Sequence, residues 1–290
     1  MTLIAIATCA DESNLFYDEA PLVDYLQKQG MCLYPVIWNS PEIDWTSYDL
    51  VVIRNTWDYH HQISAFRAWL DYLERHHIPI LNPLALVRWN IEKSYLQQLA
   101  DQGIATLPTI FAKGQSINLL ETLKNRAWDR AVVKPIISGS GDNTWIISSD
   151  NAEKSQHPFD WLNDTIGMMV QPLASQIRSD GEYSLVFFGG IFSHAVRKKP
   201  ADDHFLVHEE RGGTIERIAA DESLIQQAQQ ALSVTQQLTG IMPTYARVDG
   251  FIDEGQFVLM ELECIEPELY FTRADDAAER FGKAILKALQ

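Results

Sequence analysis

Two pairs of charged residues near the C-terminal end of the chain have the spacing of a metal site. Arg247 and Asp249 are two residues apart, as are Glu261 and Glu263, and each pair lies in a strand-like run. Residues two apart in a strand point to the same face. Three carboxylates beside one guanidinium require a compensating cation, and so few oxygens suit Mg²⁺ shared with substrate phosphates. The alternative is a solvent-facing strand with a surface ion pair.

The turn between the two runs sets the predicted pairing of these side chains. Residues 253–255 (Asp-Glu-Gly) are interpreted as a three-residue turn, with Ile252 opposite Gln256. Arg247 would then lie opposite Glu261, and Asp249 opposite Leu259. All the charged side chains would project from one face of the ribbon.

A lysine in an apolar strand precedes a loop of small residues. Lys134 follows two valines, and Gly139 and Gly141 lie in the loop 138–142. A buried lysine is costly without an anionic partner. A point charge below and backbone N–H groups above are what a lid over polyphosphate requires. The loop has neither the third glycine nor the following helix of a dinucleotide-binding turn. The alternative is an edge-strand lysine followed by an ordinary turn.

Length and composition are typical of a cytoplasmic enzyme. A chain of 290 residues with 46% hydrophobic content can form more than one domain. The net charge of −16 argues against nucleic acid as a partner. Three cysteines without metal-ligand spacing favour a reducing compartment. The apolar segment 2–10 is too short to cross a bilayer and has no basic flank, so we expect no membrane partner.

Strand-like and helix-like segments alternate along the chain, which is typical of an α/β protein. The expected strands cover 3–8, 31–37, 50–53, 78–81, 106–111, 131–135, 168–171, 183–188, 191–196, 245–252 and 256–265. The expected helices cover 15–29, 63–76, 90–102, 224–238 and the end from about 275, with a further helix start at Asn82-Pro83.

In this order, these parts resemble the ATP-grasp superfamily, and the resemblance covers most of the chain. In that superfamily two lobes clamp ATP, two lysines and a glycine-rich lid contact its phosphates, and a terminal acidic strand pair binds Mg²⁺. The resemblance implies ATP with Mg²⁺ or Mn²⁺ as cofactors. The nucleotide-binding residues that it implies are Lys93, Lys134, Gly139, Gly141, Gln171, Leu173, Glu182 and Lys198.

The same resemblance assigns the catalytic and metal-binding residues. The implied metal ligands are Asp249, Glu261 and Glu263. Arg247 corresponds to the arginine beside the acyl-phosphate, and Lys198 or Lys199 to the later lysine that contacts the transferred phosphate. The chain departs from the family twice, because Gln171 stands where many members have Glu and Glu263 where many have Asn. The second departure adds negative charge and should favour tighter metal binding.

The resemblance also implies the domain organisation. The expected fold is α/β, with an N-terminal Rossmann-like parallel-sheet domain over residues 1–89. A two-lobed ATP-grasp domain with mainly antiparallel sheets follows over 90–290. Its small lobe covers about 104–172 and its large lobe about 173–290.

Shorter motifs are similar to those of the cyclo-ligase branch that closes O-ureido-serine into cycloserine. They lie at 8–11, 52–59, 81–83, 89–96, 211–213 and 261–269. Arg54 follows a strand, where open α/β sheets bind ligands, and could pair with a substrate carboxylate between Trp57 and Tyr59. The alternative pairs Arg54 with Asp58 and buries Trp57 between the lobes. The further candidate substrate residues are Asp11, Arg211 and Gly212.

The function implied is that of an ADP-forming ligase. A small amino-acid-like carboxylic acid would be phosphorylated by ATP, and an amine, on a second molecule or on the same one, would displace phosphate. The alternatives are a non-catalytic ATP-binding regulator, a phosphotransferase that releases a phosphorylated product, and a ligase like the peptide and glutathione synthetases. A homodimer is one open form of assembly.

Overall fold

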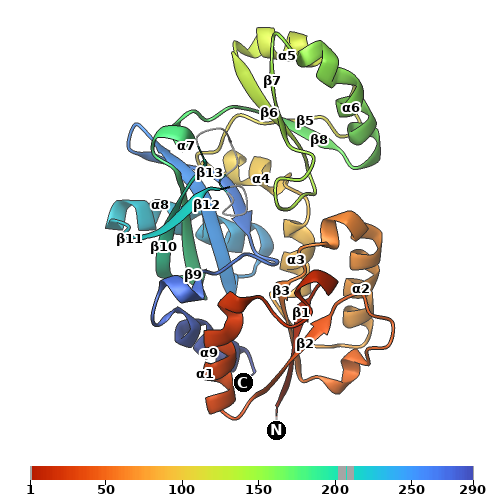
Figure 1. Cartoon of the computed structure of the whole chain (residues 1–290), viewed down its shortest axis with the longest axis vertical. Coiled ribbons are helices and arrows are strands. Elements are labelled where there is room, and N and C mark those ends of the chain that lie inside the picture. Colours follow the sequence, from red (N-terminus) through yellow and green to blue (C-terminus); the bar gives the residue numbers. More distant parts are fainter. Residues whose placement is uncertain (1, 202–206, 208–211, 290) are drawn as a thin grey trace.

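Three β-sheets organise the chain in the computed structural model, which describes residues 2–201, 207 and 212–289. A parallel sheet and a small antiparallel sheet lie at opposite ends of the molecule, and a larger antiparallel sheet lies beside the junction between them (Figure 1). The predicted fold class is confirmed. The parallel sheet falls within 1–89 and both antiparallel sheets within 90–290, while the boundaries themselves stay predictions. None of the described helices is both long and apolar enough to cross a membrane.

The N-terminal sheet has the order β2-β1-β3-β4 and is parallel throughout. These strands are β1 (Leu3–Thr8), β2 (Cys32–Ile37), β3 (Leu50–Asn55) and β4 (Ile80–Leu81), joined by α1 (Ala20–Lys28) and α2 (Ile63–Arg75). Strands β1 and β3 are buried on both faces, which explains their continuous apolar runs. Helix α1 begins later than predicted, because Leu15 has a positive φ and Pro21 is tolerated only in the first turn.

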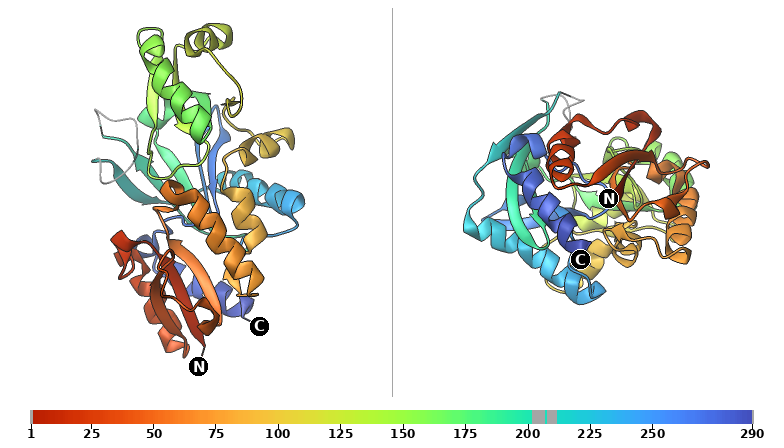
Figure 2. Two further views of the ribbon diagram at one scale, coloured as in Figure 1. Left: turned by 90° about the vertical axis from the view of Figure 1, so that its right-hand side faces the viewer. Right: turned by 90° about the horizontal axis from the view of Figure 1, so that it is seen from below.

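The small lobe is an antiparallel sheet of order β5-β8-β6-β7 with two helices. Its strands are β5 (Ile110–Phe111), β6 (Arg130–Pro135), β7 (Trp145–Ser148) and β8 (Met168–Pro172), and its helices are α5 (Leu119–Arg126) and α6 (Ala152–Thr165). The helices lie on one side of the sheet (Figure 2). Sequence reasoning missed α5, α6 and β7; α6 contains Pro158, which argues against a helix when only the sequence is read.

The large sheet has the order β11-β10-β9-β12-β13. Its strands are β9 (Glu182–Phe188), β10 (Ile191–Lys199), β11 (Thr214–Ile218), β12 (Tyr245–Asp253) and β13 (Gln256–Glu263). Helices α8 (Glu222–Thr239) and α9 (Ala277–Ala288) pack on its opposite faces. Helix α9 also packs on α1: a Cβ at Gly282 would fall 2.3 Å from the Tyr25 ring, so only glycine fits this contact.

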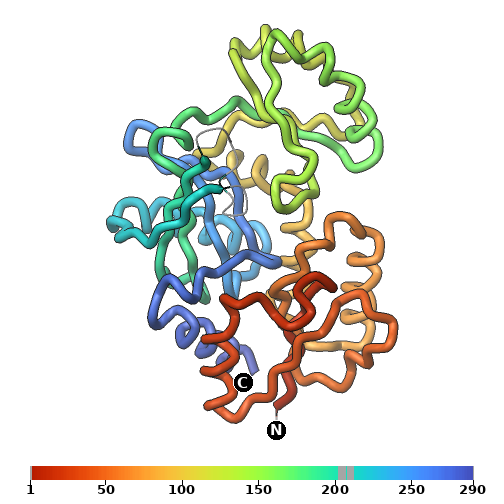
Figure 3. Tube along the Cα trace, viewed as in Figure 1, coloured from red at the N-terminus to blue at the C-terminus, as the bar shows by residue number. Residues whose placement is uncertain are grey.

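Two asparagines join the N-terminal domain to the charged ribbon. Helices α3 (Leu84–Asn90) and α4 (Tyr95–Asp101) carry the chain towards the small lobe (Figure 3). Helix α3 follows the predicted helix start at Asn82-Pro83, and α4 lies within the helix predicted over 90–102. Asn82 was predicted to cap the helix that starts there, but its side chain donates to the carbonyls of Tyr245 and Cys264 instead, at 2.8 Å each. Asn90 donates to the Leu262 carbonyl and accepts from the Cys264 N–H. The base of the ribbon is therefore fixed to α3.

The predicted register of the ribbon is wrong. Asp253 pairs with Gln256, so the turn has two residues, Glu254 and Gly255, and both have the positive φ that such a tight turn needs. A bulge follows, because Gly250 pairs with Leu259 while the next residue, Asp249, pairs with Glu261. A Cβ at Gly250 would lie 2.3 Å from the Val258 carbonyl oxygen, so this close approach requires glycine.

Candidate active site

The charged side chains of the ribbon face a cavity of about 580 Å³, which is lined by both antiparallel sheets and by residues outside the strands of the N-terminal domain. With the two-residue turn and the bulge, Arg247 lies opposite Glu263 and Asp249 lies opposite Glu261. The single charged face that the sequence predicts is therefore formed, with different partners. Most predicted site residues line this cavity: Lys93, Lys134, Gly139, Gly141, Gln171, Leu173, Glu182, Lys198, Arg247, Asp249, Glu261 and Glu263.

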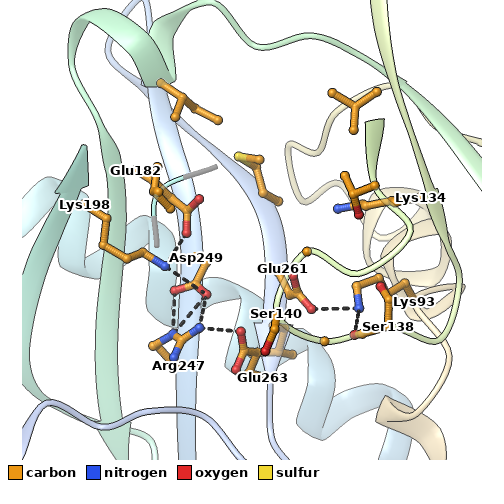
Figure 4. Close-up of a pocket in the computed structure, with 18 of the residues that line it drawn as sticks. Lys93, Lys134, Ser138, Ser140, Glu182, Lys198, Arg247, Asp249, Glu261 and Glu263 are labelled. Carbon is orange, nitrogen blue, oxygen red and sulfur yellow. Dashed lines mark hydrogen bonds and ion pairs between the residues drawn. The ribbon is translucent and has the colours of Figure 1, made fainter. Parts of the chain in front are cut away.

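Arg247 holds two of the three carboxylates (Figure 4). Its Nε and Nη2 donate to Asp249 at 2.9–3.0 Å, Nη2 also pairs with Glu263, and Nη1 donates to the Glu268 carbonyl at 3.1 Å. Burial opposes ionisation of Asp249, but the charges of Arg247 and Lys198 outweigh it and hold the pKa of Asp249 below its ordinary value.

At Glu263, the nearby positive charge is too small to keep the carboxyl group ionised at its ordinary pKa. Burial raises the pKa of Glu263 well above its ordinary value; Arg247 opposes this, while Asp249 and Glu261 add to it. Three crowded carboxylates with one partly shared guanidinium therefore leave room for a cation. Their hard oxygen ligands suit Mg²⁺ or Mn²⁺.

Lys198 lies on the other side of Asp249. Its Nζ is 2.5 Å from Glu182 Oε1 and 3.8 Å from Asp249 Oδ2. Burial acts to lower the pKa of Lys198, but these two carboxylates raise it above its ordinary value. Lys199 is not among the lining residues, because neighbouring residues of β10 point to opposite faces. Of the two lysines predicted as alternatives, the structure places Lys198 in the cavity, and the expected catalytic contact of Lys199 does not fit this geometry.

Two lysines face the ribbon from the small-lobe side. Lys93 Nζ lies 3.0 Å from Glu261 Oε1 and donates to the Ser138 carbonyl at 2.7 Å, so it links the ribbon to the glycine-rich loop (Figure 4). Lys134 has no ion-pair partner among the described residues. Burial lowers the pKa of Lys134, and Glu261 offsets only part of that effect. An anionic ligand in the cavity would supply the partner that Lys134 lacks.

The far end of the cavity has more apolar side chains in its lining. Val132, Ile146 and Met260 line it beside the segment that ends β8. Gln171 is buried and its Nε2 donates to Thr109 Oγ1 at 2.9 Å. The N–H of Leu173 already donates to the Arg130 carbonyl. A backbone contact from Leu173 to a nucleobase would therefore use the Leu173 carbonyl. Apolar walls with a few polar groups are typical of a nucleobase pocket.

The glycine-rich loop lies between the two ends. Ser140 and Gly141 both have positive φ, and the Asp142 N–H donates to the Gly139 carbonyl at 3.0 Å. Gly139 packs directly on the ring of His60, where an added Cβ would lie 3.2 Å from Nδ1. The loop therefore touches the N-terminal domain as well as Lys93.

The opposite end of the cavity contains Trp57, which was predicted as a pocket wall, together with Glu266 and Tyr270, which sequence reasoning did not select. Trp57 Nε1 donates to the Glu266 carbonyl at 3.0 Å, and the Trp57 ring packs edge-on against Phe16. Burial raises the pKa of the Glu266 carboxyl to about 7. Tyr270 lies under the Arg247 guanidinium, 5.7 Å from ring centre to Cζ. The motif at 261–269 contained Glu266, but nothing in its spacing separated it from a solvent-exposed glutamate.

The predicted substrate residues do not gather at this end. Arg54 is fully buried outside the lining and binds Glu19, with Nη2 to Oε1 at 2.7 Å, and the Pro267 carbonyl, so the prediction that it anchors a carboxylate is wrong. Its predicted alternative partner, Asp58, instead accepts from Trp38 Nε1. Asp11 is exposed and Gly212 lies outside the lining. Arg211 lies outside the described residues.

Comparisons with known proteins agree with this arrangement. A family model described as the N-terminal domain of D-cycloserine synthetase DcsG matches residues 4–82. The cycloserine biosynthesis protein DcsG of Streptomyces lavendulae is 27% identical over the full length of both chains. The crystal structure of D-cycloserine synthetase DcsG matches with a TM-score of 0.90 and 26% identity, over 99% of this chain and 100% of the other.

More distant structures share the fold. D-alanine–D-alanine ligase from Bacillus anthracis, solved with ATP, matches with a TM-score of 0.68 and 15% identity, over 100% of this chain and 97% of that one. The ligase PsnB, solved with a precursor variant, Mg and ADP, matches with 0.67 and 15%, over 99% and 98%. The three sheets have the arrangement of the ATP-grasp ligase fold. Over its full length, the chain is similar to the D-cycloserine synthetase DcsG.

Proposed function

We propose that this enzyme is an ADP-forming ligase that activates a small amino-acid-like carboxylic acid as an acyl-phosphate and joins it to an amine. The observation that carries the proposal is the charge arrangement of the cavity. Lys134, a half-buried lysine with no ion-pair partner among the described residues, faces three carboxylates and a fixed arginine across one space of about 580 Å³. This arrangement suits a polyphosphate and a metal ion together.

The nucleotide would lie from the apolar end to the ribbon. Its base would lie between the walls of Val132 and Met260, near Gln171 and Leu173, as the lining indicates. Glu182 would accept from the ribose hydroxyls. Glu182 now forms an ion pair with Lys198. When nucleotide binds, the lysine would contact a phosphate and the carboxylate would contact the ribose. Lys93, Lys134 and the N–H groups of the glycine-rich loop would bind the phosphates.

Asp249, Glu261 and Glu263 would hold Mg²⁺ or Mn²⁺. The pKa of Glu263, which is raised first by burial and then by the neighbouring carboxylates, supports this fit, because a cation would offset both effects. When bound, the metal would neutralise charge on the phosphate oxygens during transfer. The protein's own part is to keep these oxygens in place, since Arg247 fixes Asp249 and Glu263 while Lys93 fixes Glu261.

The acid and the amine would occupy the end formed by Trp57, Glu266 and Tyr270. Arg247 lies between this end and the ribbon, so it would face the carboxyl group as phosphate is transferred. An amine needs a neighbouring group that can take its proton as it attacks. Glu266, with a pKa of about 7, is suited to that exchange near neutral pH. No covalent enzyme intermediate is required.

Full-length similarity to a D-cycloserine synthetase favours an intramolecular ring closure. A second candidate is an intermolecular ligase like the peptide synthetases, which the fold shared with D-alanine–D-alanine ligase favours. The difference is testable, because a cyclising enzyme needs one organic substrate and an intermolecular ligase needs two.

The test is release of ADP and of phosphate with O-ureido-serine, single amino acids and pairs of amino acids. A cyclising ligase releases both products with one compound alone. ADP without free phosphate would indicate a phosphotransferase. If no carboxylic acid stimulates ADP release, the ligase proposal fails and a regulatory role for ATP binding becomes the better account.

A further inference from the structure

A second cluster of metal-binding side chains lies where the glycine-rich loop meets the N-terminal domain. His60 and His61 belong to the short helix Tyr59–Gln62, and Asp142 ends the loop. One ligand atom from each of the three lies within 4.8 Å of the others, and His61 Nδ1 is 3.8 Å from Asp142 Oδ2. The cluster is separate from the carboxylates of the ribbon, and none of its members has a role in the proposed reaction.

His60 is the least satisfied member of the cluster. Both ring nitrogens are buried and neither makes a hydrogen bond of good geometry within the described part of the chain. The ring is held between Gly139 and the ring of His61, whose centre is 4.0 Å away. Burial lowers the pKa of His60 to about 4, although Asp142 and the Trp57 backbone oppose this, so the imidazole is uncharged. An unbonded polar group in such a place is costly unless a ligand satisfies it.

The helix that carries the two histidines is well fixed. Asp58, at its start, accepts from Trp38 Nε1 at 2.7 Å and from Gln62 Nε2 at 3.2 Å. Tyr59 is buried in the aromatic cluster below. Two ligands on a rigid element and a third on a loop form a site that a metal completes by drawing the loop inwards.

We propose that His60, His61 and Asp142 bind Zn²⁺ and thereby hold the glycine-rich loop against the N-terminal domain. Two imidazoles and one carboxylate suit a borderline ion such as Zn²⁺ better than Mg²⁺, which prefers oxygen ligands. Ligand atoms around tetrahedral Zn²⁺ are roughly 3.3 Å apart, so the ligand atoms must approach one another by up to about 1.5 Å. Water can complete the coordination, since His61 and Asp142 are partly exposed.

Zinc at this position would act on the loop that covers the nucleotide. Gly139 and Gly141 line the cavity, and the same loop ends in Asp142. We expect bound Zn²⁺ to slow departure of the nucleotide, because the loop must open for release. This consequence rests on the proposed function; the binding of Zn²⁺ does not.

The test begins with calorimetric titration of Zn²⁺ into the whole protein, with excess Mg²⁺ to fill the ribbon carboxylates. Wild type should bind one Zn²⁺, and His61→Ala and Asp142→Asn should each weaken binding at least about tenfold. The matched control changes another adjacent, exposed pair at the end of α2, as His76→Ala with His77→Asn. Asparagine is chosen because residue 77 has a φ of 53°. The control should bind as wild type does.

Unchanged zinc affinity in both cluster variants would overturn the site, as would equal loss in the control. Thermal unfolding without zinc shows whether each variant is folded. X-ray absorption at the zinc edge gives an independent readout, and a ligand shell without imidazole would also refute the site. The second consequence is measured as dissociation of a fluorescent ADP analogue. Zn²⁺ should slow it in wild type and leave it unchanged in His61→Ala; equal slowing in both would refute the loop effect alone.

Discussion

The two ends of the cavity are built in different ways. At the ribbon, ionic side chains lie on adjacent strands, and each carboxylate is held by a named cation: Asp249 and Glu263 by Arg247, and Glu261 by Lys93. At the Trp57 end, the walls come from loops of two domains and the contacts are mainly aromatic faces and backbone carbonyls. The first construction fixes charge for phosphate transfer, and the second shapes a pocket that can differ between enzymes with the same chemistry.

The largest expected effect comes from the ribbon. Glu261→Gln removes the charge that Lys93 and Lys134 face and one proposed metal ligand, so turnover should fall about a hundred- to a thousandfold. Steady-state ADP release measures this. The control is Glu254→Gln, in the turn of the same ribbon, which should keep its activity. Near-normal turnover of Glu261→Gln would remove the metal assignment.

The arginine between the two ends should show an effect on turnover without a matching effect on ATP affinity. Arg247→Lys keeps the charge but loses the guanidinium that holds Asp249, Glu263 and the Glu268 carbonyl together. We expect turnover to fall about ten- to a hundredfold, as for lost charge-assisted hydrogen bonds. ATP affinity by calorimetry should change much less. If both fall equally, Arg247 belongs to the nucleotide site and does not face the acyl group.

Lys134 tests the nucleotide side alone. Lys134→Ala should weaken ATP binding by about 1.5–3 kcal/mol, or ten- to a hundredfold, because a charge-assisted contact is lost. Lys124→Ala, on an exposed position of α5 in the same lobe, is the control. Unchanged ATP affinity together with a lower melting temperature would mean that Lys134 has a structural role in β6.

The same contrast explains what could be predicted from the sequence. Charged residues two apart in apolar strands mark the ribbon face, because alternation is a local property. Its register was not predictable, since the turn depends on positive φ at Glu254 and the bulge on the contact of Gly250 with the Val258 carbonyl. Both the turn and the bulge depend on steric contacts that exist only in the folded chain. Together they determine which residue lies opposite each carboxylate.

Residues whose partners are distant in sequence were misread. Arg54 has the type and position of a carboxylate anchor, yet Glu19 and the Pro267 carbonyl, 213 residues away, already bind it. Asn82 has the type of a helix cap, but its partners lie in β12 and beyond β13. The type of a side chain shows which groups it can bind. The topology of the fold determines whether the protein itself already supplies such a group.

Glu266 gives the smallest expected effect and tests the Trp57 end directly. Its folded pKa of about 7 lies above the ordinary value of 4.5, so the folded state retains this proton while the unfolded state loses it. The contribution of Glu266 to the free energy of unfolding therefore falls as pH rises from about 4.5 to 7 and above. Glu266→Gln should remove this pH-dependent decrease in the free energy of unfolding. Relative to wild type, the variant should gain about 1–3 kcal/mol between pH 5 and pH 8.

Urea unfolding of the metal-free protein at the two pH values measures this gain, with the exposed Glu42→Gln as the control that should show none. The variant should also lose the rise in turnover with pH near 7 that ionised Glu266 would provide. A stability gain with an unchanged pH profile of turnover would separate the two roles. The carboxyl would then be buried and protonated, but another group would take the proton of the amine.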